Sequence, residues 1–406
     1  MTQAQPVDAA ARIPIGIAVK LYLLTFATFL VGTNSFVIAG LLPDIGHSLN
    51  AGTSDVGLSF TVYAGTVAVL APTFATVFGR VSRTLLVTVG MILVAAGTAL
   101  TAISTTLPIF MVGRAIAAVG GAAIVPTAVA AAASMVTPLR RGQAIGIVAL
   151  GFTLSTAIGS PLGTAIAAVG GWQIPLAAVA VLSLVSAASL AFFVRGIPAS
   201  PPLSFARRFA VLGDPRTLLT VLAVVATVMG FNIAYIYSSA FTATATGGSR
   251  SLFAALLLLY GIGGVLGNLI AGRLTDRFGN RIVASILLAT QLAVLALMPP
   301  AEPNFIVMAV LFLIWGASAF GAGIPIQHRL VAIDPERSAV SLSWYSTALY
   351  VGIAIAPIVG GFALDAAGPN EVPHAAAAAI LLAVVLLQVG YLVGRRRGTD
   401  ATLLED

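Results

Sequence analysis

The sequence predicts an all-α polytopic membrane protein, and three observations lead to this fold class. Hydrophobic residues make up 59% of the 406 residues and charged residues only 8%, whereas a soluble domain carries about 25% charged residues. The apolar residues fall into continuous blocks of ~20 residues or more, the length at which a helix crosses a hydrocarbon core. Landmark residues also recur at a nearly constant spacing, which indicates two related halves.

Twelve apolar blocks are long enough to be transmembrane helices. Their approximate bounds are 15–41, 54–78, 84–104, 107–135, 142–169, 172–194, 216–242, 250–272, 281–298, 304–332, 338–367 and 373–394. The longest polar interruption, 195–215, contains prolines, serines and arginines, as a linker does. It divides the chain into an N-terminal six-helix bundle (residues 1–194) and a C-terminal six-helix bundle (216–406). The first apolar run is too long for the core of a signal peptide, so we expect a retained helix.

The two bundles are predicted to be copies of one another. Four landmark pairs share an offset of 197 or, for the last pair, 196 residues: Tyr63 and Tyr260, Arg80 and Arg277, Pro138 and Pro335, Pro161 and Pro357. Because six helices are an even number, both copies have the same orientation in the membrane and are related by a pseudo-two-fold axis. Two such bundles facing one another enclose a cavity near the midplane, which is the architecture of a transporter.

Basic residues predict how the chain is oriented. With both termini cytoplasmic, 18 of the 20 basic residues lie in or beside cytoplasmic segments, and only Arg114 and Arg250 fall elsewhere. This bias predicts a multi-pass protein with both ends inside the cell. It also explains the net charge of +7 without a nucleic-acid partner, since the basic residues stand in short clusters between apolar runs.

Several classes of chemistry find no support in the sequence. Cysteine is absent and the three histidines lie in different segments, so neither a metal site nor a disulfide is expected. No phosphate-binding glycine loop appears, which argues against ATP as the energy source. No catalytic constellation lies within the membrane. We therefore expect neither an enzyme nor a cofactor.

A charged turn between two apolar runs is the first of several family motifs. Residues 272–281 read G-R-L-T-D-R-F-G-N-R, and a weaker copy at 75–83 carries glycine in place of the aspartate. Other motifs are GTNSFVIAGLLPDIG (32–46), Arg114 in GRAIAAVGGAA, and GSPLG (159–163). Over nearly its whole length the chain resembles the major facilitator superfamily, and within it the drug:proton antiporters and arabinose-efflux-type sugar permeases.

This resemblance implies a function. Such proteins are secondary transporters of the bacterial inner membrane, and the resemblance implies efflux of a small neutral or amphipathic molecule, a sugar or a drug, by alternating access. The expected partners are this substrate, the lipid bilayer and, if transport is proton-coupled, protons; we expect a monomer. Two alternatives remain open: a facilitated-diffusion uniporter, and a non-transporting sensor or receptor on the same scaffold.

The resemblance also assigns residues to gating and packing. The turn with Asp276 and Arg277 would meet Arg140 and Arg141 at the start of the fifth helix, and Arg80 in the weaker copy would meet the start of the eleventh. We interpret both contacts as cytoplasmic gate locks, formed when the cavity opens outward; a topology signal alone is the other interpretation. The small-residue motifs predict close helix packing at Pro161, Gly163, Pro357, Gly360 and Gly361.

Proton coupling is where the sequence departs from the family. Related permeases often carry a membrane-embedded glutamate at the position of Ser35, and no acidic residue of this chain falls near the middle of a predicted helix. A proton carrier needs a group whose charge changes. Coupling would therefore have to use Asp44, Asp55, Asp365 or His328, with or without the intramembrane Arg114, or would not occur.

Substrate contacts are predicted from neutral polar and aromatic residues inside the helices. Such side chains hydrogen-bond hydroxyl or amide groups and cover apolar faces. The predicted substrate-binding residues are Asn34, Ser35, Tyr63, Asn232, Tyr235, Tyr237, Tyr345 and Tyr350. Each could instead form a helix–helix hydrogen bond. Their neutral character favours a neutral or weakly charged substrate.

Overall fold

The computed structural model describes residues 14–78, 81–195, 197 and 209–396. Within these residues, twelve helical segments are long and apolar enough to cross a membrane. The predicted all-α fold class with twelve membrane helices is confirmed.

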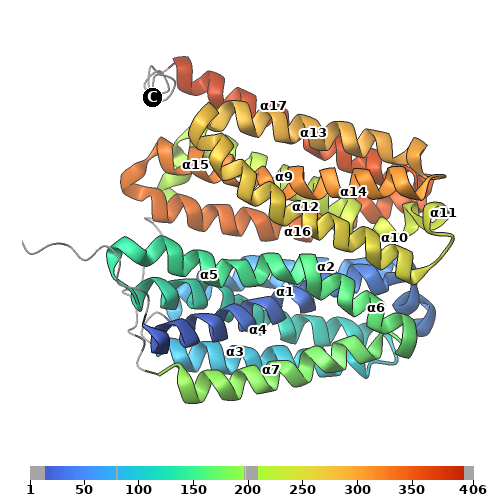
Figure 1. The fold of residues 1–406 in the computed structure, drawn as a ribbon, viewed down its shortest axis with the longest axis horizontal. Coiled ribbons are helices and arrows are strands. Elements are labelled where there is room, and N and C mark those ends of the chain that lie inside the picture. Colours follow the sequence, from blue (N-terminus) through green and yellow to red (C-terminus); the bar gives the residue numbers. More distant parts are fainter. Residues whose placement is uncertain (1–13, 79–80, 196, 198–208, 397–406) are drawn as a thin grey trace, which may run out of the picture.

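The first six segments lie together in the lower part of Figure 1 and are called the N half. Its elements are α1 (Ile15–Leu49), α2 (Thr53–Val77), α3 (Arg83–Ala102), α4 (Leu107–Ser134), η1 (Pro138–Arg140), α5 (Arg141–Leu154), η2 (Ser155–Gly159), α6 (Ser160–Gly170) and α7 (Gln173–Phe193). The fifth segment is not a regular helix, because the π-helical turn η2 separates α5 from α6. Pro161, the second residue after this turn, lacks the N–H that a regular helix would use there.

The last six segments form the upper part of Figure 1 and are called the C half. Its elements are η3 (Val211–Gly213), α9 (Pro215–Ile236), α10 (Ser238–Phe241), α11 (Ala243–Thr246), α12 (Arg250–Phe278), α13 (Asn280–Ala301), α14 (Phe305–Gly321), α15 (Gly323–Ile333), η4 (Pro335–Arg337), α16 (Ser338–Ala367) and α17 (Glu371–Arg396). Most of the predicted linker lies outside the described residues, so the division at 194 and 216 stays a prediction.

Side-chain caps and glycines set many of the helix ends. Asp214 and Asn304 accept backbone hydrogen bonds at the starts of α9 and α14, which satisfies N–H groups that the helix leaves open. Gly171 and Gly368 end α6 and α16 with φ of +88° and +92°, a conformation in which a side chain would be strained. These two glycines are 197 residues apart, so the helix ends follow the same offset as the sequence landmarks.

Three predicted helix ends were wrong. The eighth helix was predicted to end at 272, but α12 continues to Phe278, so most of the segment predicted as a charged turn is helical. Two further errors concern the first and seventh helices. The first helix was predicted to end at 41, but α1 continues through Pro43 to Leu49 and is capped by Asn50 in a left-handed conformation. The seventh was predicted to continue to 242, but α9 ends at Ile236 and the chain turns through Tyr237 into the short helix α10. These two errors fall at the face of the molecule opposite the start of α1.

The interface between the halves consists of two equivalent helix pairs. Helix α2 packs along α16, and η2 and α6 pack along α12. Under the 197-residue offset, α2 corresponds to α12 and α6 corresponds to the end of α16, so each pair is the counterpart of the other. Thr61 donates a hydrogen bond from Oγ1 to the Ala354 carbonyl across the first pair (2.7 Å). In the second pair, a Cβ at Gly261 would overlap Ala157, so these backbones approach closely.

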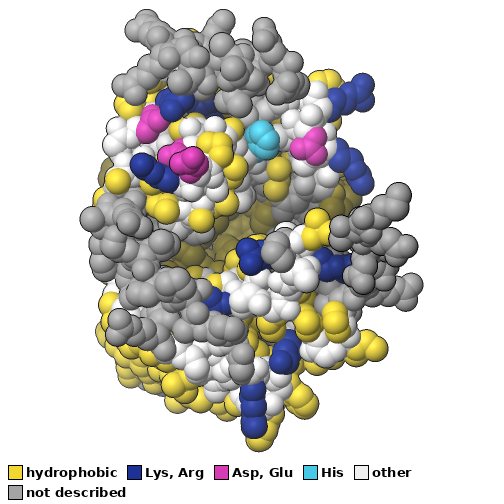
Figure 2. Space-filling view, turned by 90° about the vertical axis from the view of Figure 1, so that its left-hand side faces the viewer, with side chains coloured by type: hydrophobic (Ala, Val, Ile, Leu, Met, Phe, Trp, Pro, Cys, Tyr) yellow, Lys and Arg dark blue, Asp and Glu magenta, His cyan; other side chains and the backbone are white. Residues whose placement is uncertain are grey.

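The molecule has two different faces along the membrane normal. We call the face where α1 begins and α17 ends the terminal face, on the left of Figure 1, and the opposite one the far face. Seen from the terminal face, the surface is hollowed between the halves, and hydrophobic side chains form the floor of the hollow (Figure 2). Charged residues stand around its rim rather than inside it.

Candidate functional site

A cavity of about 430 Å³ lies between the halves. Its residues come from α1, α4, α5 and η2 on one side and from α9, α12, α14, α15 and α16 on the other. None of the described residues that line it is charged. Because both halves contribute to it, movement of one half against the other changes its access.

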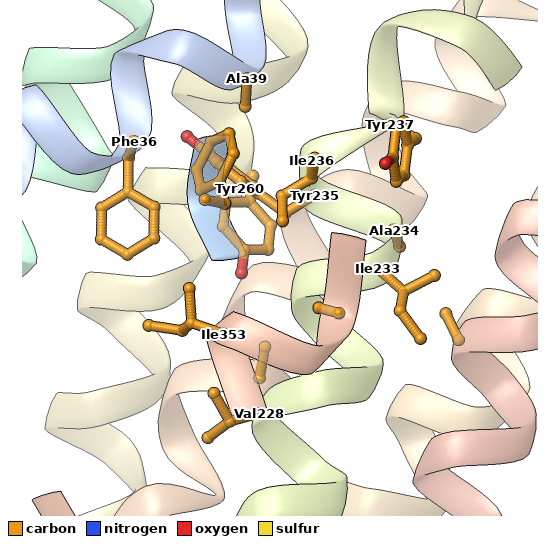
Figure 3. Packing of buried hydrophobic residues seen from close by; sticks show 14 of the residues in the cluster. Phe36, Ala39, Val228, Ile233, Ala234, Tyr235, Ile236, Tyr237, Tyr260 and Ile353 are labelled. Atoms are coloured by element: carbon orange, nitrogen blue, oxygen red, sulfur yellow. The ribbon is translucent and has the colours of Figure 1, made fainter. Parts of the chain in front are cut away.

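Aromatic side chains form much of the cavity wall. Tyr235 and Tyr260 lie side by side (Figure 3), with ring centroids 5.2 Å apart. Phe36 meets Tyr235 edge to face at 5.8 Å, and behind the wall Trp315 packs on Tyr260 at 4.4 Å. Aromatic contacts of this geometry hold the rings in fixed orientations. The wall is thus a rigid, apolar surface suited to a flat or amphipathic ligand.

A few polar groups interrupt this wall. Asn232 donates from Nδ2 to the Val228 carbonyl (2.8 Å), while its Oδ1 has no partner among the described residues. Thr156, in η2, has a buried Oγ1 that likewise lacks one. Gln327 donates to the Gly323 carbonyl (3.2 Å), and a Cβ at Gly323 would come within 2.7 Å of the Tyr345 hydroxyl. Polar groups from both halves can therefore hydrogen-bond a ligand.

The predicted substrate-binding residues fall into two groups. Asn232, Tyr235, Tyr345 and Tyr350 line the cavity. Asn34, Ser35, Tyr63 and Tyr237 are not among its lining residues and are buried elsewhere. Tyr237 and Asn34 hydrogen-bond to other helices, as the alternative of helix–helix hydrogen bonding predicts. Ser35 instead bonds within α1, and the Tyr63 hydroxyl has no hydrogen-bond partner among the described residues.

Asn34 and Tyr63 surround the intramembrane Arg114. The Arg114 side chain is 0% exposed, and its Nη1 donates to the Asn34 carbonyl oxygen (2.7 Å). The guanidinium stands over the Tyr63 ring, 4.5 Å from the ring centroid. Ser35, the residue after Asn34, donates from its hydroxyl to the Val31 carbonyl within α1 (2.8 Å). Arg114 is thus held inside the N half rather than extended toward the headgroups.

Tyr237 closes the far side of the interface. Its hydroxyl donates to the Pro357 carbonyl (2.9 Å), and Figure 3 shows it pointing away from Tyr235. A Cβ at Gly57 of α2 would overlap the same hydroxyl, and one at Gly361 would approach it to 2.9 Å. The Tyr237 ring is thus packed between the halves, and a side chain larger than that of glycine at Gly57 or Gly361 would collide with its hydroxyl.

An ion pair ties the halves together at the far face. Asp44, near the end of α1, pairs with Arg250 at the start of α12. Asp55 does not join it, because its carboxylate accepts from the Gly52 N–H (3.2 Å) at the start of α2. The structure therefore places Asp44 at a contact between halves and Asp55 at a helix cap.

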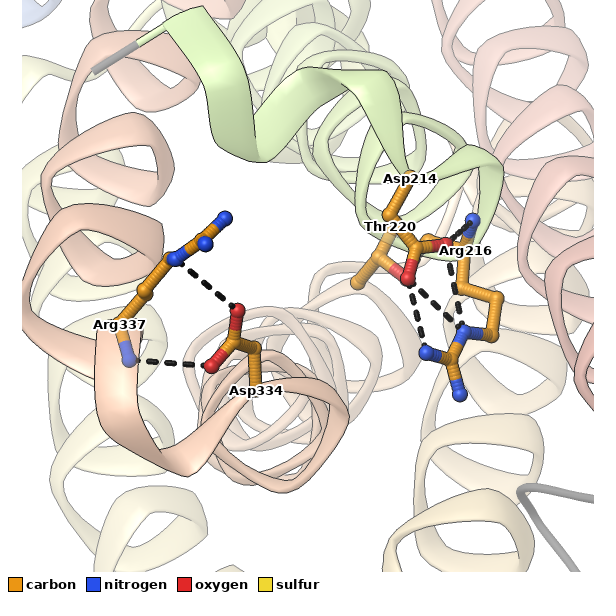
Figure 4. A network of polar contacts seen from close by, with 5 residues as sticks. All are labelled: Asp214, Arg216, Thr220, Asp334 and Arg337. Atoms are coloured by element: carbon orange, nitrogen blue, oxygen red, sulfur yellow. Dashed lines mark hydrogen bonds and ion pairs between the residues drawn. The ribbon is translucent and has the colours of Figure 1, made fainter. Parts of the chain in front are cut away.

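The predicted gate residues of the terminal face do not meet in this structure. Asp276, Arg277 and Arg141 are exposed and Arg140 is partly exposed, and among the described residues Asp276 forms no ion pair; Arg80 lies outside that part of the chain. Nearby acidic groups are occupied locally, as Figure 4 shows: Asp214 pairs with Arg216 (2.8 Å) and Asp334 with Arg337 (3.7 Å). The predicted lock between the Asp276 turn and the start of the fifth helix is thus open, and the predicted contact of Arg80 lies outside the described residues.

The predicted packing residues lie at helix contacts. Pro161, Gly163, Pro357, Gly360 and Gly361 are all buried. A Cβ at Gly163 would overlap Val37, and one at Gly360 would come within 2.8 Å of the Tyr237 ring. At these positions small residues admit a neighbouring helix or an aromatic ring.

Some residues of the site were missed by sequence reasoning. Arg250 carried a signal, since it is one of two basic residues that break the orientation bias. Tyr260 carried another, because it is the counterpart of Tyr63. The aliphatic and phenylalanine residues of the cavity carried none, since a phenylalanine in a membrane helix looks the same whether it faces lipid or a cavity. The described residues that line the cavity are Thr28, Phe36, Val125, Val129, Val148, Ala149, Phe152, Thr153, Thr156, Val228, Phe231, Asn232, Tyr235, Tyr260, Asn268, Ala319, Phe320, Gly323, Ile324, Gln327, Tyr345, Ser346, Leu349, Tyr350 and Ile353.

Comparison with known proteins supplies a family. A model of the Major Facilitator Superfamily matches residues 24–332 and 219–404. The chain is 26% identical over 366 residues to the uncharacterized MFS-type transporter YbcL of Bacillus subtilis (strain 168), covering 90% of this chain and 94% of the relative.

Solved structures match the fold. A bacterial homolog of the human lysosomal transporter Spinster, in an inward-facing and unoccupied conformation, superimposes with a TM-score of 0.74 and 15% identity, over 95% of this chain and 98% of that one. The occupied inward-facing form gives 0.72 and 17%, with the same coverage. At these identities the likeness shows the fold alone.

Proposed function

The chain belongs to the Major Facilitator Superfamily of transporters, and from this premise we propose that it exports a small neutral or amphipathic molecule, such as a sugar or a drug, by alternating access. The observation that carries the proposal is the uncharged, aromatic-walled cavity between the two halves. A pocket without charged groups gives a charged ligand no compensation for its lost hydration. Aromatic faces and scattered hydroxyl and amide groups suit a ligand with an apolar body and a few polar substituents.

An exporter needs a state that is open to the cytoplasm, and the hollow on the terminal face provides one if that face is cytoplasmic. We propose that orientation from the bias of basic residues. The hollow on this face then admits a ligand from the cytoplasm or the inner leaflet. Parting of the Asp44–Arg250 ion pair, and of the Tyr237 ring from Gly57 on α2, would open the far face. Rocking of the halves about the two helix pairs would close the terminal face.

Coupling to protons is the less supported part of this proposal. No carboxylate lines the cavity among its described residues, so no group there changes charge when it binds a proton near neutral pH. This observation favours a facilitated-diffusion uniporter as the second candidate. An antiporter would instead have to use acidic groups at the faces, such as Asp44 or Asp365.

Flux measurements separate these functions. The purified protein in proteoliposomes would be tested with candidate sugars and lipophilic drugs chosen by a thermal-shift screen, with and without a pH gradient. A gradient-driven flux supports the antiporter, whereas a flux that ignores the gradient supports the uniporter. Binding without any flux would contradict transport and favour a sensor.

A pair of variants ties the flux to the cavity. Asn232→Ala removes the unpartnered Oδ1 that faces the cavity region and should raise the half-saturating ligand concentration roughly 2- to 10-fold. Gln291→Ala is the matched control, since Gln291 is a fully buried amide of the C half that does not line the cavity. Equal effects of the two variants would contradict the assignment of this cavity.

A further inference from the structure

The environment of Arg114 contains hydrogen-bond donors but lacks a counter-charge. Of its guanidinium nitrogens, Nη1 donates to the Asn34 carbonyl (2.7 Å) and lies 3.4 Å from Asn34 Oδ1. Nε and Nη2 are buried without a partner among the described residues. Asn34 Nδ2 and the Tyr63 hydroxyl are buried and unpartnered as well. Four donor atoms therefore gather within one buried cluster and lack acceptors.

The nearest acidic residues cannot supply the missing charge. Residues 1–194 contain three acidic side chains: Asp8, which lies outside the described residues, Asp44 and Asp55. Asp44 is ten residues beyond Asn34 on α1 and Asp55 is eight before Tyr63 on α2, which places them about 15 and 12 Å away along their helices. Asp44 is also paired with Arg250.

The C half also contains a buried arginine, whose surroundings can be compared with those of Arg114. Arg329 is 2% exposed; its Nε donates to Thr220 Oγ1 (3.1 Å) and its guanidinium lies 3.5 Å from the centroid of the Tyr391 ring. Both arginines thus stack on a tyrosine. Further donors surround the cation at Arg114, and clustered donors around a buried cation favour a negatively charged ligand.

We propose that Arg114, Asn34 and Tyr63 form a binding site for a small monovalent anion, either a halide or a small free carboxylate. The site lies behind the cavity wall: Tyr350 lines the cavity and also packs against the buried cluster that contains Tyr63. A rotation of the Tyr350 ring would connect the two. This assignment is independent of transport, because the anion would bind whether or not the protein moves a substrate.

Thermal denaturation in detergent tests the proposal. The protein would be prepared in a sulfate buffer free of halides and carboxylates, then titrated with sodium chloride, bromide or acetate at constant ionic strength. The wild type should show a rise in Tm that saturates with anion concentration. Saturation with halides identifies an inorganic anion, and saturation with acetate alone identifies a small carboxylate. No saturable response to any of the three overturns the proposal.

Variants assign the response to the cluster. Arg114→Gln should abolish it, whereas the matched control Arg329→Gln should keep it. Asn34→Asp places a carboxylate beside the guanidinium in nearly the same volume, so this variant should be as stable in sulfate as the wild type with bound anion, and should no longer respond. Tyr63→Phe should raise the anion concentration that gives half of the maximal response roughly 2- to 10-fold. If Arg114→Gln does not fold, an unchanged anion response in Asn34→Asp and Tyr63→Phe would still overturn the site.

Discussion

The ion pair at the far face predicts how the conformational equilibrium responds to one substitution. Asp44 and Arg250 join the halves only while the far face is closed, so replacing Asp44 with asparagine should favour the state open on that face. The side chains are 24% and 50% exposed, and solvent therefore screens their attraction. An exposed pair contributes about 0.2–1 kcal/mol. The population of the far-open state should accordingly rise roughly 1.5- to 5-fold.

Cysteine labelling measures this population directly. The chain has no cysteine, so a single Ala39→Cys substitution gives an unambiguous reporter: Ala39 lies on α1 five residues before Asp44 and is 0% exposed. A membrane-impermeant maleimide added at the far side should label it in proportion to the far-open fraction. Asp44→Asn should raise the labelling rate by the predicted factor, and the exchange Asp44→Arg with Arg250→Asp should return it toward the wild-type rate.

Two results would refute this reasoning. An unchanged labelling rate in Asp44→Asn would mean that the pair contributes nothing to closure. A charge exchange that labels as fast as the single variant would mean that the charges act separately and not as a pair. Asp55→Asn is the control, since Asp55 is a nearby acidic residue that caps α2 and forms no ion pair among the described residues.

Three further substitutions probe the same equilibrium. Asp276→Asn should leave Tm of the terminal-open state unchanged, because Asp276 is exposed there, and should slow far-side labelling if its lock exists only in the other state; faster labelling would contradict that lock. Tyr237→Phe removes a hydrogen bond that lies inside the C half and should leave far-side labelling close to the wild-type rate, since the ring still packs beside Gly57 of the N half; labelling raised several-fold would mean that the hydroxyl itself holds the far face closed. Gly261→Val would overlap Ala157 and should abolish flux while raising far-side labelling; normal flux would show that the two backbones need not approach.

The helices of this protein could be predicted from the sequence, whereas the side-chain contacts between the halves could not. A hydrocarbon solvent forces every backbone polar group to pair within its own segment, so twelve long apolar runs predict twelve helices. The duplicated landmarks predict equivalent elements, and even the helix-ending Gly171 and Gly368 obey the offset. Neither property says which side chain meets which across the interface.

Tyr235 and Tyr237 show why the site was harder to predict. They are two residues apart, which on a helix turns them about 200° from one another, and α9 ends between them. Tyr235 therefore faces the cavity and donates to Ser160 (2.8 Å), whereas Tyr237 donates to Pro357 at the far closure. Sequence reasoning grouped them because both are tyrosines in one apolar run. The end of α9 and the contacts with the other half determine that Tyr235 lines the cavity and that Tyr237 lies at the closed far face.

The duplicated tyrosines show how the two halves diverged in chemistry. Tyr63 and Tyr260 are counterparts, yet Tyr63 lies under Arg114 while Tyr260 packs on Trp315 and lines the cavity. Under the 197-residue offset, the counterpart of Arg114 is Leu311. A buried charge therefore exists at this position in only one half, and an apolar aromatic wall has formed at the other. Since a buried charge is costly in hydrocarbon, its presence in one copy requires a compensation that the other copy does not need, and the donor cluster around Arg114 is where a bound anion would supply it.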